Sequence, residues 1–254
     1  MFMNPLRITA VSYLNTFPFV YGIQQSGFLK NFRLDLEIPS LCAENLKNET
    51  TDISLVPAGA IPELKQYHFI SGYCIGAVGP VQTVLLLSRV PLEKITQVHL
   101  DFDSRTSVRL VKLLAANYWG ISPVWKNLAA GEASHTFSVE SMVAIGDKTF
   151  SLRPYFPYIY DLAEEWVRFT DLPFVFAVWL SREKLPDNIL NPFCRALTYG
   201  VDHKRECIEF FREKLPPCGD CLEYLEKNIS YPFDERKRQG LKLFLSYLGN
   251  SRDT

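Results

Sequence analysis

Groups of hydrogen-bonding side chains follow the predicted strands of this chain, and such groups can bind a small polar molecule. The first group lies in VSYLNTFP, where Ser12, Tyr13, Asn15 and Thr16 separate a buried run from a short helical pattern. A Ser or Asx turn needs only one or two such residues. Four of them exceed that need, so we predict that this loop forms part of a ligand site.

A second group stands at the start of a strongly amphipathic helical pattern. In DSRTSVRL, residues Arg105, Thr106 and Ser107 belong to the first helical turn. Backbone N–H groups of that turn lack intrahelical partners and can bind a carboxylate or phosphate, to which an arginine adds a bidentate contact. Simple N-capping with a solvated arginine explains the same residues, so both interpretations stay open at this point.

Three more strand ends carry residues that suit a binding site. Gly59 follows a strand that ends in VPAG, and Gly79 and Pro80 lie beside a strand in VGPVQT. Close approach of the backbone to a ligand and simple strand termination both account for those glycines. Gly146 and Asp147 follow a strand in AIGDKTF, where a hairpin turn with GDK at its tip is an equally good explanation.

The sequence lacks the motifs of several classes of chemistry. GxSxG, Walker A and GxGxxG patterns are absent, and the four histidines form no HxH or HExxH pair. Cys218 and Cys221 form a CxxC, which is typical of a redox pair or of half a zinc site. It lies between helical patterns without a second pair of ligands nearby, so buried or free thiols are favoured.

Composition points to a globular protein with a small-molecule ligand. The chain of 254 residues has 47% hydrophobic and 22% charged residues, which is typical of a globular protein. Its formal net charge of -1 provides no positive electrostatic field that would attract nucleic acid or an anionic membrane. Its longest apolar runs are too short for a bilayer, and the N-terminus has no apolar segment typical of a signal peptide. We expect a soluble cytoplasmic protein.

Strands alternate with helices along the chain, which predicts an α/β fold with mostly parallel sheets. A self-contained βαβ section lies in the middle, between two intensely apolar strands. We therefore predict two lobes with a ligand cleft between them. Lobe 1 would comprise residues 1–86 and 180–254, lobe 2 residues 87–179, and the crossover strands would lie near 83–89 and 174–181.

Longer strings resemble one known family. They are VSYLNTFPFVYG, DISLVPAG, YCIGAVGPVQTVLLLS, SRTSVRLVKLL, VAIGDKTF and DLAEEWVRFTDLPFVFAVWLSR. They occur in the order expected for the chorismate dehydratases of menaquinone biosynthesis, the MqnA/MqnD family of the futalosine pathway. The resemblance implies a type II periplasmic-binding-protein-like fold. It also implies a lyase that removes water from chorismate to give 3-(1-carboxyvinyloxy)benzoate, without a metal or organic cofactor.

The resemblance also implies roles for individual residues. Asn15 and Thr83, from SYLN and GPVQT, would carry most of the catalysis, and Asp147 would line the cleft. Asn15 would bond the departing hydroxyl or hold the ring. The residues expected to bind the substrate are Ser12, Tyr13, Gly59, Gly79, Pro80, Arg105, Thr106, Ser107 and Gly146.

Two points of the mechanism stay open. The base that removes the C3 proton of chorismate is either Asp147 or a carboxylate of the substrate itself, and we favour the substrate carboxylate. A polar residue is expected after the third strand, but this chain has Ala58 there. The backbone N–H of Gly59 could replace the missing contact.

Two other functions compete with this one. The sister lyase that acts on cyclic dehypoxanthine futalosine is expected to use a histidine base, and no histidine occurs at the strand ends. A non-catalytic receptor for a small anion fits the fold equally well, but the missing signal peptide argues against a periplasmic one. The expected partners are the small-molecule substrate and, at most, a second copy of the chain.

Overall fold

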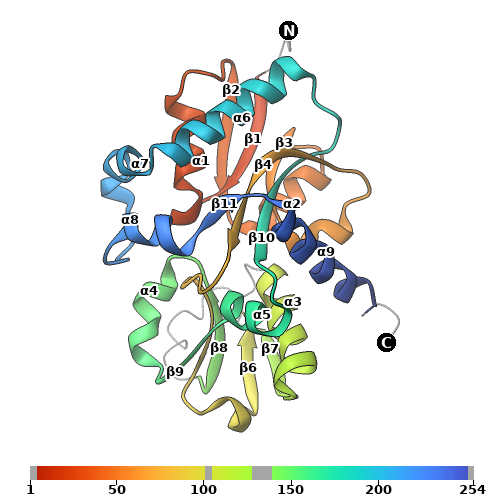
Figure 1. The fold of residues 1–254 in the computed structure, drawn as a ribbon, viewed down its shortest axis with the longest axis vertical. Coiled ribbons are helices and arrows are strands. Elements are labelled where there is room, and N and C mark those ends of the chain that lie inside the picture. Colours follow the sequence, from red (N-terminus) through yellow and green to blue (C-terminus); the bar gives the residue numbers. More distant parts are fainter. Residues whose placement is uncertain (1–4, 101–104, 128–138, 251–254) are drawn as a thin grey trace.

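The protein consists of two α/β lobes, one above the other in Figure 1. The structure is a computed structural model, and it describes residues 5–100, 105–127 and 139–250. Each lobe is built on one sheet, with helices packed on its faces. This confirms the predicted α/β, two-lobe fold, but both sheets are mixed and not mostly parallel as expected.

A six-stranded sheet forms the upper lobe, in the order β11-β4-β10-β3-β1-β2. β1 runs parallel to both β2 and β3, whereas β10 is antiparallel to β3 and to β4. The strands are β1 (Leu6–Val11), β2 (Phe32–Glu37), β3 (Ile53–Pro57), β4 (His68–Ala77), β10 (Phe174–Ser181) and β11 (Ser230–Pro232).

The lower lobe contains a five-stranded sheet in the order β7-β6-β8-β5-β9. β5 is antiparallel to its neighbours β8 and β9, and β6 is parallel to β7 and β8. The strands are β5 (Val84–Ser88), β6 (Gln97–Leu100), β7 (Val124–Asn127), β8 (Ser141–Ile145) and β9 (Tyr158–Asp161).

Helices cover the sheets, with α1 and α6 on one side of the upper sheet and α2 on the other in Figure 1. The α-helices are α1 (Phe17–Gln25), α2 (Pro39–Lys47), α3 (Arg105–Leu114), α4 (Lys148–Leu152), α5 (Leu162–Thr170), α6 (Asp187–Asp202), α7 (Lys204–Phe210), α8 (Cys221–Glu223) and α9 (Glu235–Asn250). Short 3₁₀ turns span Leu14–Thr16, Ala58–Glu63 (η2), Leu92–Lys94, Arg153–Tyr155 and Arg212–Lys214, and π-helical turns span Ala115–Trp119 and Tyr224–Asn228. Among the helices of the described segments, none has the length and apolar character that a membrane crossing requires.

The two strands expected to cross between lobes do not do so. β5 pairs along its whole length with β8 and lies in the lower sheet, and β10 pairs with β3 and β4 in the upper sheet. Their continuous apolar sequences reflect burial on both faces of a sheet rather than a passage between lobes. The connections are instead the short segments 78–83 and 171–173. The predicted lobes, 1–86 with 180–254 and 87–179, would divide β5 and β10; the division into lobes stays a prediction.

Close packing of α1 on α6 supports the loop that carries Asn15. A β-carbon on Gly200 would overlap the carbonyl oxygen of Pro18, and one on Gly22 would overlap the carbonyl oxygen of Ala196. Both glycines are therefore needed for the backbones to approach so closely. Pro18 lies in the first turn of α1, immediately after the turn that contains Asn15, so this contact positions the start of the helix.

We expect Gly200→Ala to lower the free energy of unfolding by about 1–3 kcal/mol, because the two helices must move apart. Urea unfolding followed by far-UV circular dichroism measures the change. Gly249→Ala in α9, where an added β-carbon meets nothing within 4 Å, is the matched control and should not destabilise. Equal urea midpoints for both variants would show that the helix contact is not tight.

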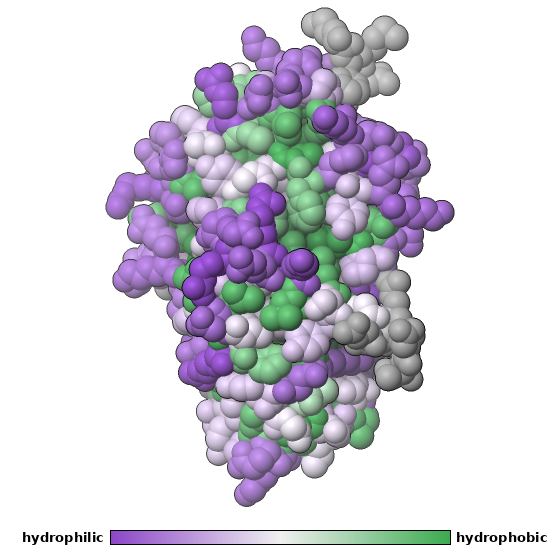
Figure 2. Space-filling view, turned by 45° about the vertical axis from the view of Figure 1, so that its right-hand side comes forward, coloured by the Kyte–Doolittle hydropathy of each residue, from purple (hydrophilic) through white to green (hydrophobic). Residues whose placement is uncertain are grey.

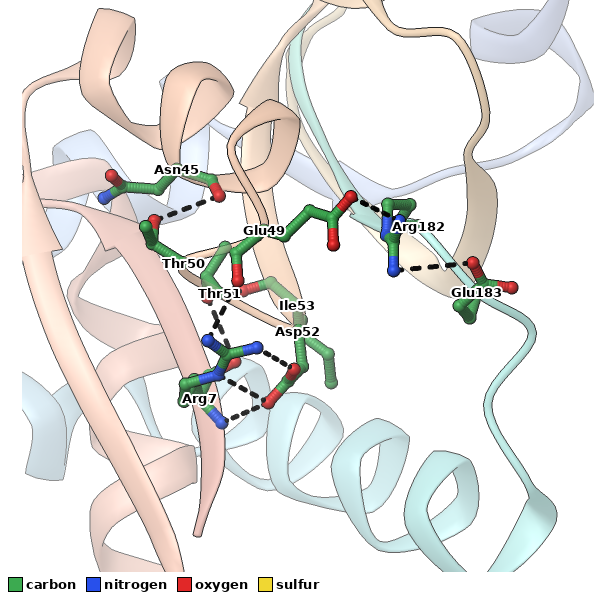
Figure 3. Close-up of polar contacts among 9 residues, drawn as sticks. All are labelled: Arg7, Asn45, Glu49, Thr50, Thr51, Asp52, Ile53, Arg182 and Glu183. Atoms are coloured by element: carbon green, nitrogen blue, oxygen red, sulfur yellow. Dashed lines mark hydrogen bonds and ion pairs between the residues drawn. The ribbon is translucent and has the colours of Figure 1, made fainter. Parts of the chain in front are cut away.

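An ion pair ties the start of β1 to the start of β3, as Figure 3 shows. The Arg7 guanidinium donates from Nη2 to Oδ1 of Asp52 at 2.6 Å and from Nε to Oδ2 at 3.2 Å, and its backbone N–H donates to Oδ2 at 2.9 Å. Its Nη1 also donates to the carbonyl of Glu49 at 2.9 Å. The side chain of Glu49 pairs in turn with Arg182, which follows β10. The network thus joins three neighbouring strands at one end of the sheet.

Asp52→Asn is expected to lower the free energy of unfolding by about 1 kcal/mol at pH 7, a modest value because Arg7 is 42% exposed. Burial alone would raise the pKa of the Asp52 carboxyl, but the hydrogen bonds from Arg7 outweigh it and lower the pKa below 3.8. The stabilisation is therefore present above pH 3.8 and disappears as the pH falls through the lower, folded-state value.

Urea titrations at neutral pH and below about pH 3 test this expectation, because the wild-type and variant curves should converge in acid. Asp202→Asn at the exposed end of α6 is the control. A difference of the same size at both pH values would contradict the assignment to this ion pair.

The surface mixes hydrophilic and apolar side chains. On the face in Figure 2, apolar side chains gather along the middle of the upper lobe, with hydrophilic ones on either side. Large exposed apolar residues such as Phe69 and Phe210 come from separate elements, β4 and α7. Scattered exposure of this kind is ordinary for a folded protein.

Candidate active site

A pocket of about 60 Å³ lies between the two lobes. Strand ends from both sheets and the start of a helix surround it. The sequence predicts a cleft at this place in the fold. Ile75, Val81, Ile145 and Phe176 contribute to its apolar walls. Its polar lining residues are Tyr13, Asn15, Thr16, Thr83, Thr106 and Ser107.

Asn15 is held from two sides. It lies in the 3₁₀ turn Leu14–Thr16, between β1 and α1. Its backbone carbonyl accepts a hydrogen bond from the Tyr231 hydroxyl at 2.9 Å. Its side-chain oxygen accepts a bond from the Thr16 hydroxyl at 3.2 Å. A side chain fixed in this way can present its amide to a ligand with little further loss of entropy.

Thr83 lies across the pocket from the first loop, at the start of β5. Its hydroxyl is 2.8 Å from the Tyr224 hydroxyl, and both side chains are buried. Burial raises the pKa of Tyr224, so this phenol stays protonated. The pocket thus brings together Asn15 and Thr83, which lie 68 positions apart in the sequence.

The start of α3 brings Thr106 and Ser107 to the pocket, as predicted. Residues before Arg105, including Ser104, lie outside the described part of the chain. The Thr106 hydroxyl accepts a bond from the Gly59 N–H at 2.9 Å. That N–H is thus already bonded across the lobes and does not replace the contact missing at Ala58. A β-carbon on Gly59 would lie 2.7 Å from the Thr106 Cα, so the approach requires glycine.

Arg105 is not brought to the pocket. Its guanidinium pairs with Glu44 of α2 at 2.8 Å and with Glu63 of η2. Arg109 pairs with Glu63 at 2.9 Å and donates to the carbonyl of Gly59. These pairs join α3 of the lower lobe to the upper lobe. Among the described residues that line the pocket, none is lysine or arginine.

Gly146 forms a tight contact between the lobes. Its φ of 68° lies in the left-handed region, and a β-carbon there would come within 2.8 Å of the Tyr13 ring. Both the backbone conformation and the close approach therefore demand glycine. Tyr13 and Gly146 both line the pocket, as predicted.

Asp147 lies beside the pocket rather than in its lining. It precedes α4, so the hairpin interpretation of GDK is wrong: β8 leads into a helix. Both carboxylate oxygens accept the Leu14 N–H, at 3.2 and 3.1 Å. Burial raises the pKa of Asp147 to about 6, against the opposing effect of the Leu14 bond. The carboxyl thus links the lower lobe to the loop of Asn15.

Three other predicted contacts do not reach the pocket. Ser12 is exposed, because the chain turns outward at the end of β1. Gly79 and Pro80 belong to the connection between the lobes, where the Pro80 carbonyl accepts a bond from Asn228 at 2.9 Å. Proximity to a strand end in the sequence therefore does not suffice, because the direction of the loop decides which residues face the ligand.

Cys218 and Cys221 form a disulfide, which corrects the expectation of free or merely buried thiols. The turn between them contains Gly219 with a φ of 73°, and it brings the two Cα atoms to 5.4 Å. That separation is within the range of disulfides. The bridge closes the turn before α8, which ends immediately before Tyr224.

Tyr224 and Tyr231 were not predicted as site residues. Both come from the C-terminal quarter of the chain, where the strings of the family resemblance no longer extend. No strand was predicted in their local sequence, CLEYLEKNISYPF, so no strand end marked it as part of a site. Only the return of β11 to the upper sheet, next to β4, brings them behind the Asn15 loop.

The fold and the position of the pocket define the periplasmic-binding-protein-like class. Solved structures have a similar fold. Protein AF1704 from Archaeoglobus fulgidus matches with a TM-score of 0.77 at 13% identity, over 100% of both chains. A Candida albicans protein, described as having the generic periplasmic binding protein fold, matches with a TM-score of 0.60 at 12% identity, over 95% of this chain and 90% of the other. The alkanesulfonate-binding protein SsuA from Xanthomonas axonopodis pv. citri matches with a TM-score of 0.61 at 13% identity, over 98% and 93%.

Within that class, the chain belongs to the menaquinone biosynthesis family, whose model matches residues 6–250. A curated relative, the chorismate dehydratase of Thermus thermophilus, is 26% identical over 267 residues. The match covers 97% of this chain and 96% of the relative. The family predicted from the sequence strings is thereby confirmed.

Proposed function

We propose that the protein is a cytoplasmic chorismate dehydratase, a lyase that converts chorismate to 3-(1-carboxyvinyloxy)benzoate and water. The observation that carries the proposal is that Asn15 and Thr83 line one interlobe pocket, where the buried hydroxyl of Tyr224 contacts the Thr83 hydroxyl. Membership of the menaquinone biosynthesis family and similarity to the Thermus chorismate dehydratase support it.

The polar and apolar parts of the pocket suit a dianion that carries a ring. Thr106 and Ser107 lie in the first turn of α3, where the helix dipole and backbone N–H groups favour a carboxylate. Ile75 and Phe176 line the pocket with apolar surface, against which a six-membered ring can pack. The proposed pose places a carboxylate at α3 and the reacting ring carbons between Asn15 and Thr83.

The proposed reaction breaks the C3–H bond and uses its electron pair to complete the aromatic ring. The C4–O bond breaks, and the departing hydroxide takes up a proton and leaves as water. Asn15 donates a hydrogen bond to the departing oxygen. Orientation of the breaking bonds then supplies most of the acceleration, because aromatisation provides the driving force.

A carboxylate of chorismate is the proposed base. The Asp147 carboxylate accepts the Leu14 N–H with both oxygens and does not line the pocket. This geometry argues against Asp147 as the group that removes the C3 proton. We assign Asp147 instead to the contact between the lobes.

Ultraviolet spectroscopy with purified protein and chorismate tests the proposal. Loss of chorismate should accompany formation of the substituted benzoate, with identity checked by mass spectrometry. Tight binding of chorismate without product would instead indicate a receptor. Turnover of cyclic dehypoxanthine futalosine, with no reaction of chorismate, would indicate the sister lyase. Either result would overturn the assignment.

A further inference from the structure

We propose that Tyr224 is a positioning residue of this site, whose hydroxyl holds the Thr83 hydroxyl in a fixed orientation. The inference rests on the proposed function, because the effect is read as a rate of dehydration. Tyr224 does not line the pocket. It acts through Thr83, which does line it.

Burial and hydrogen bonding support this role. The Tyr224 side chain is only 2% exposed, and its hydroxyl is 2.8 Å from the Thr83 hydroxyl. A phenol can donate its one proton or accept a bond, so it can fix the rotamer of a neighbouring hydroxyl. The alternative contact of the Thr83 hydroxyl, to the Val81 carbonyl, is longer at 3.5 Å.

A helix cap, a disulfide and an aromatic contact hold the segment that carries Tyr224. Asp220 caps α8 by accepting the Glu223 N–H at 2.9 Å, and the disulfide between Cys218 and Cys221 closes the turn before it. The Tyr224 ring meets Phe150 of α4 edge-to-face at a centroid distance of 5.4 Å. A polar group on a support of this kind can fix the rotamers of the residues that contact the ligand.

The hydroxyl contact joins two parts of the chain that lie far apart in the sequence. Thr83 comes from the connection between the lobes, and Tyr224 comes from the C-terminal segment. Without the phenol oxygen, Thr83 loses the shorter of the two bonds of its hydroxyl. A small misplacement of reacting groups costs up to about 100-fold in rate.

The test compares Tyr224→Phe with Tyr73→Phe. Tyr73 offers a matched control, because its hydroxyl also bonds a threonine, Thr198, at 3.1 Å but lies outside the pocket lining. Tyr224→Phe should lower kcat for chorismate about 10- to 100-fold with a smaller change in KM, at an unchanged urea midpoint. Tyr73→Phe should leave kcat unchanged.

A double-mutant cycle separates positioning from general loss of structure. If Tyr224 acts through Thr83, Thr83→Val combined with Tyr224→Phe should be little worse than Thr83→Val alone. If the wild type is active, a Tyr224→Phe variant with kcat within twofold of the wild-type value would overturn the inference alone. Multiplicative losses of kcat in the double variant would have the same consequence. An inactive wild type would overturn the proposed function, and the inference with it.

Discussion

Asn15→Ala should lower kcat/KM for chorismate at least about 100-fold, the typical loss when one preorganised hydrogen-bond donor is removed from a reacting centre. Asn15 lines the pocket, and hydrogen bonds from Tyr231 and Thr16 hold it there. The loss should appear mainly in kcat, because the bond to the departing oxygen strengthens as the C4–O bond breaks. Steady-state kinetics in the ultraviolet assay measure it.

Asn188→Ala on the exposed face of α6 is the control for amide removal and should retain full activity. The urea midpoint of Asn15→Ala should be compared with that of the wild type, so that a folding defect is not mistaken for a catalytic one. A folded Asn15→Ala protein with kcat/KM within threefold of the wild type would remove Asn15 from the proposed mechanism.

Asp147→Asn should raise the free energy of unfolding at pH 7 by about 2–3 kcal/mol, because burial penalises the ionised carboxyl. The folded-state pKa of Asp147 is about 6, above the ordinary value of 3.8. The favourable contribution of this group is therefore complete below pH 3.8 and is lost as the pH rises through about 6. An asparagine oxygen can still accept the Leu14 N–H.

Urea unfolding of both proteins at about pH 3.5 and pH 7 measures this effect, since other titrating groups cancel in the difference. The variant should gain stability only at the higher pH. The same variant tests the base: turnover that is slowed but not abolished fits a substrate carboxylate. Normal binding of chorismate with no turnover would instead assign proton removal to Asp147.

Local sequence patterns predicted those residues of the candidate site that lie just after a strand or at the start of a helix. Asn15 and Gly146 follow strands, and Thr106 begins a helix, so a cleft at the strand ends already brings them together. Their identification needed only the period of the elements and the polar residues at their ends. The resemblance then ranked Asn15 and Thr83 above the others.

Partners that lie far apart along the chain could not be predicted in this way. Arg105 was expected to face an anionic ligand, but Glu44 and Glu63, 61 and 42 positions earlier, take its guanidinium. Tyr224 lies 141 positions beyond Thr83. Apolar runs such as β10 indicate burial without indicating which sheet buries them, which is why the crossovers were misplaced.

The C-terminal segment that returns to the upper sheet is synthesised last, and this affects the growing chain. Asn15 and Thr83 emerge from the ribosome early, but Tyr224 and Tyr231 emerge near the end. The two partners of β4 in the upper sheet, first β10 and then β11, also emerge well after it. Such long-range pairings form slowly and leave strand edges exposed meanwhile. A nascent chain therefore carries the Asn15 loop long before Tyr231, which bonds that loop, has been synthesised.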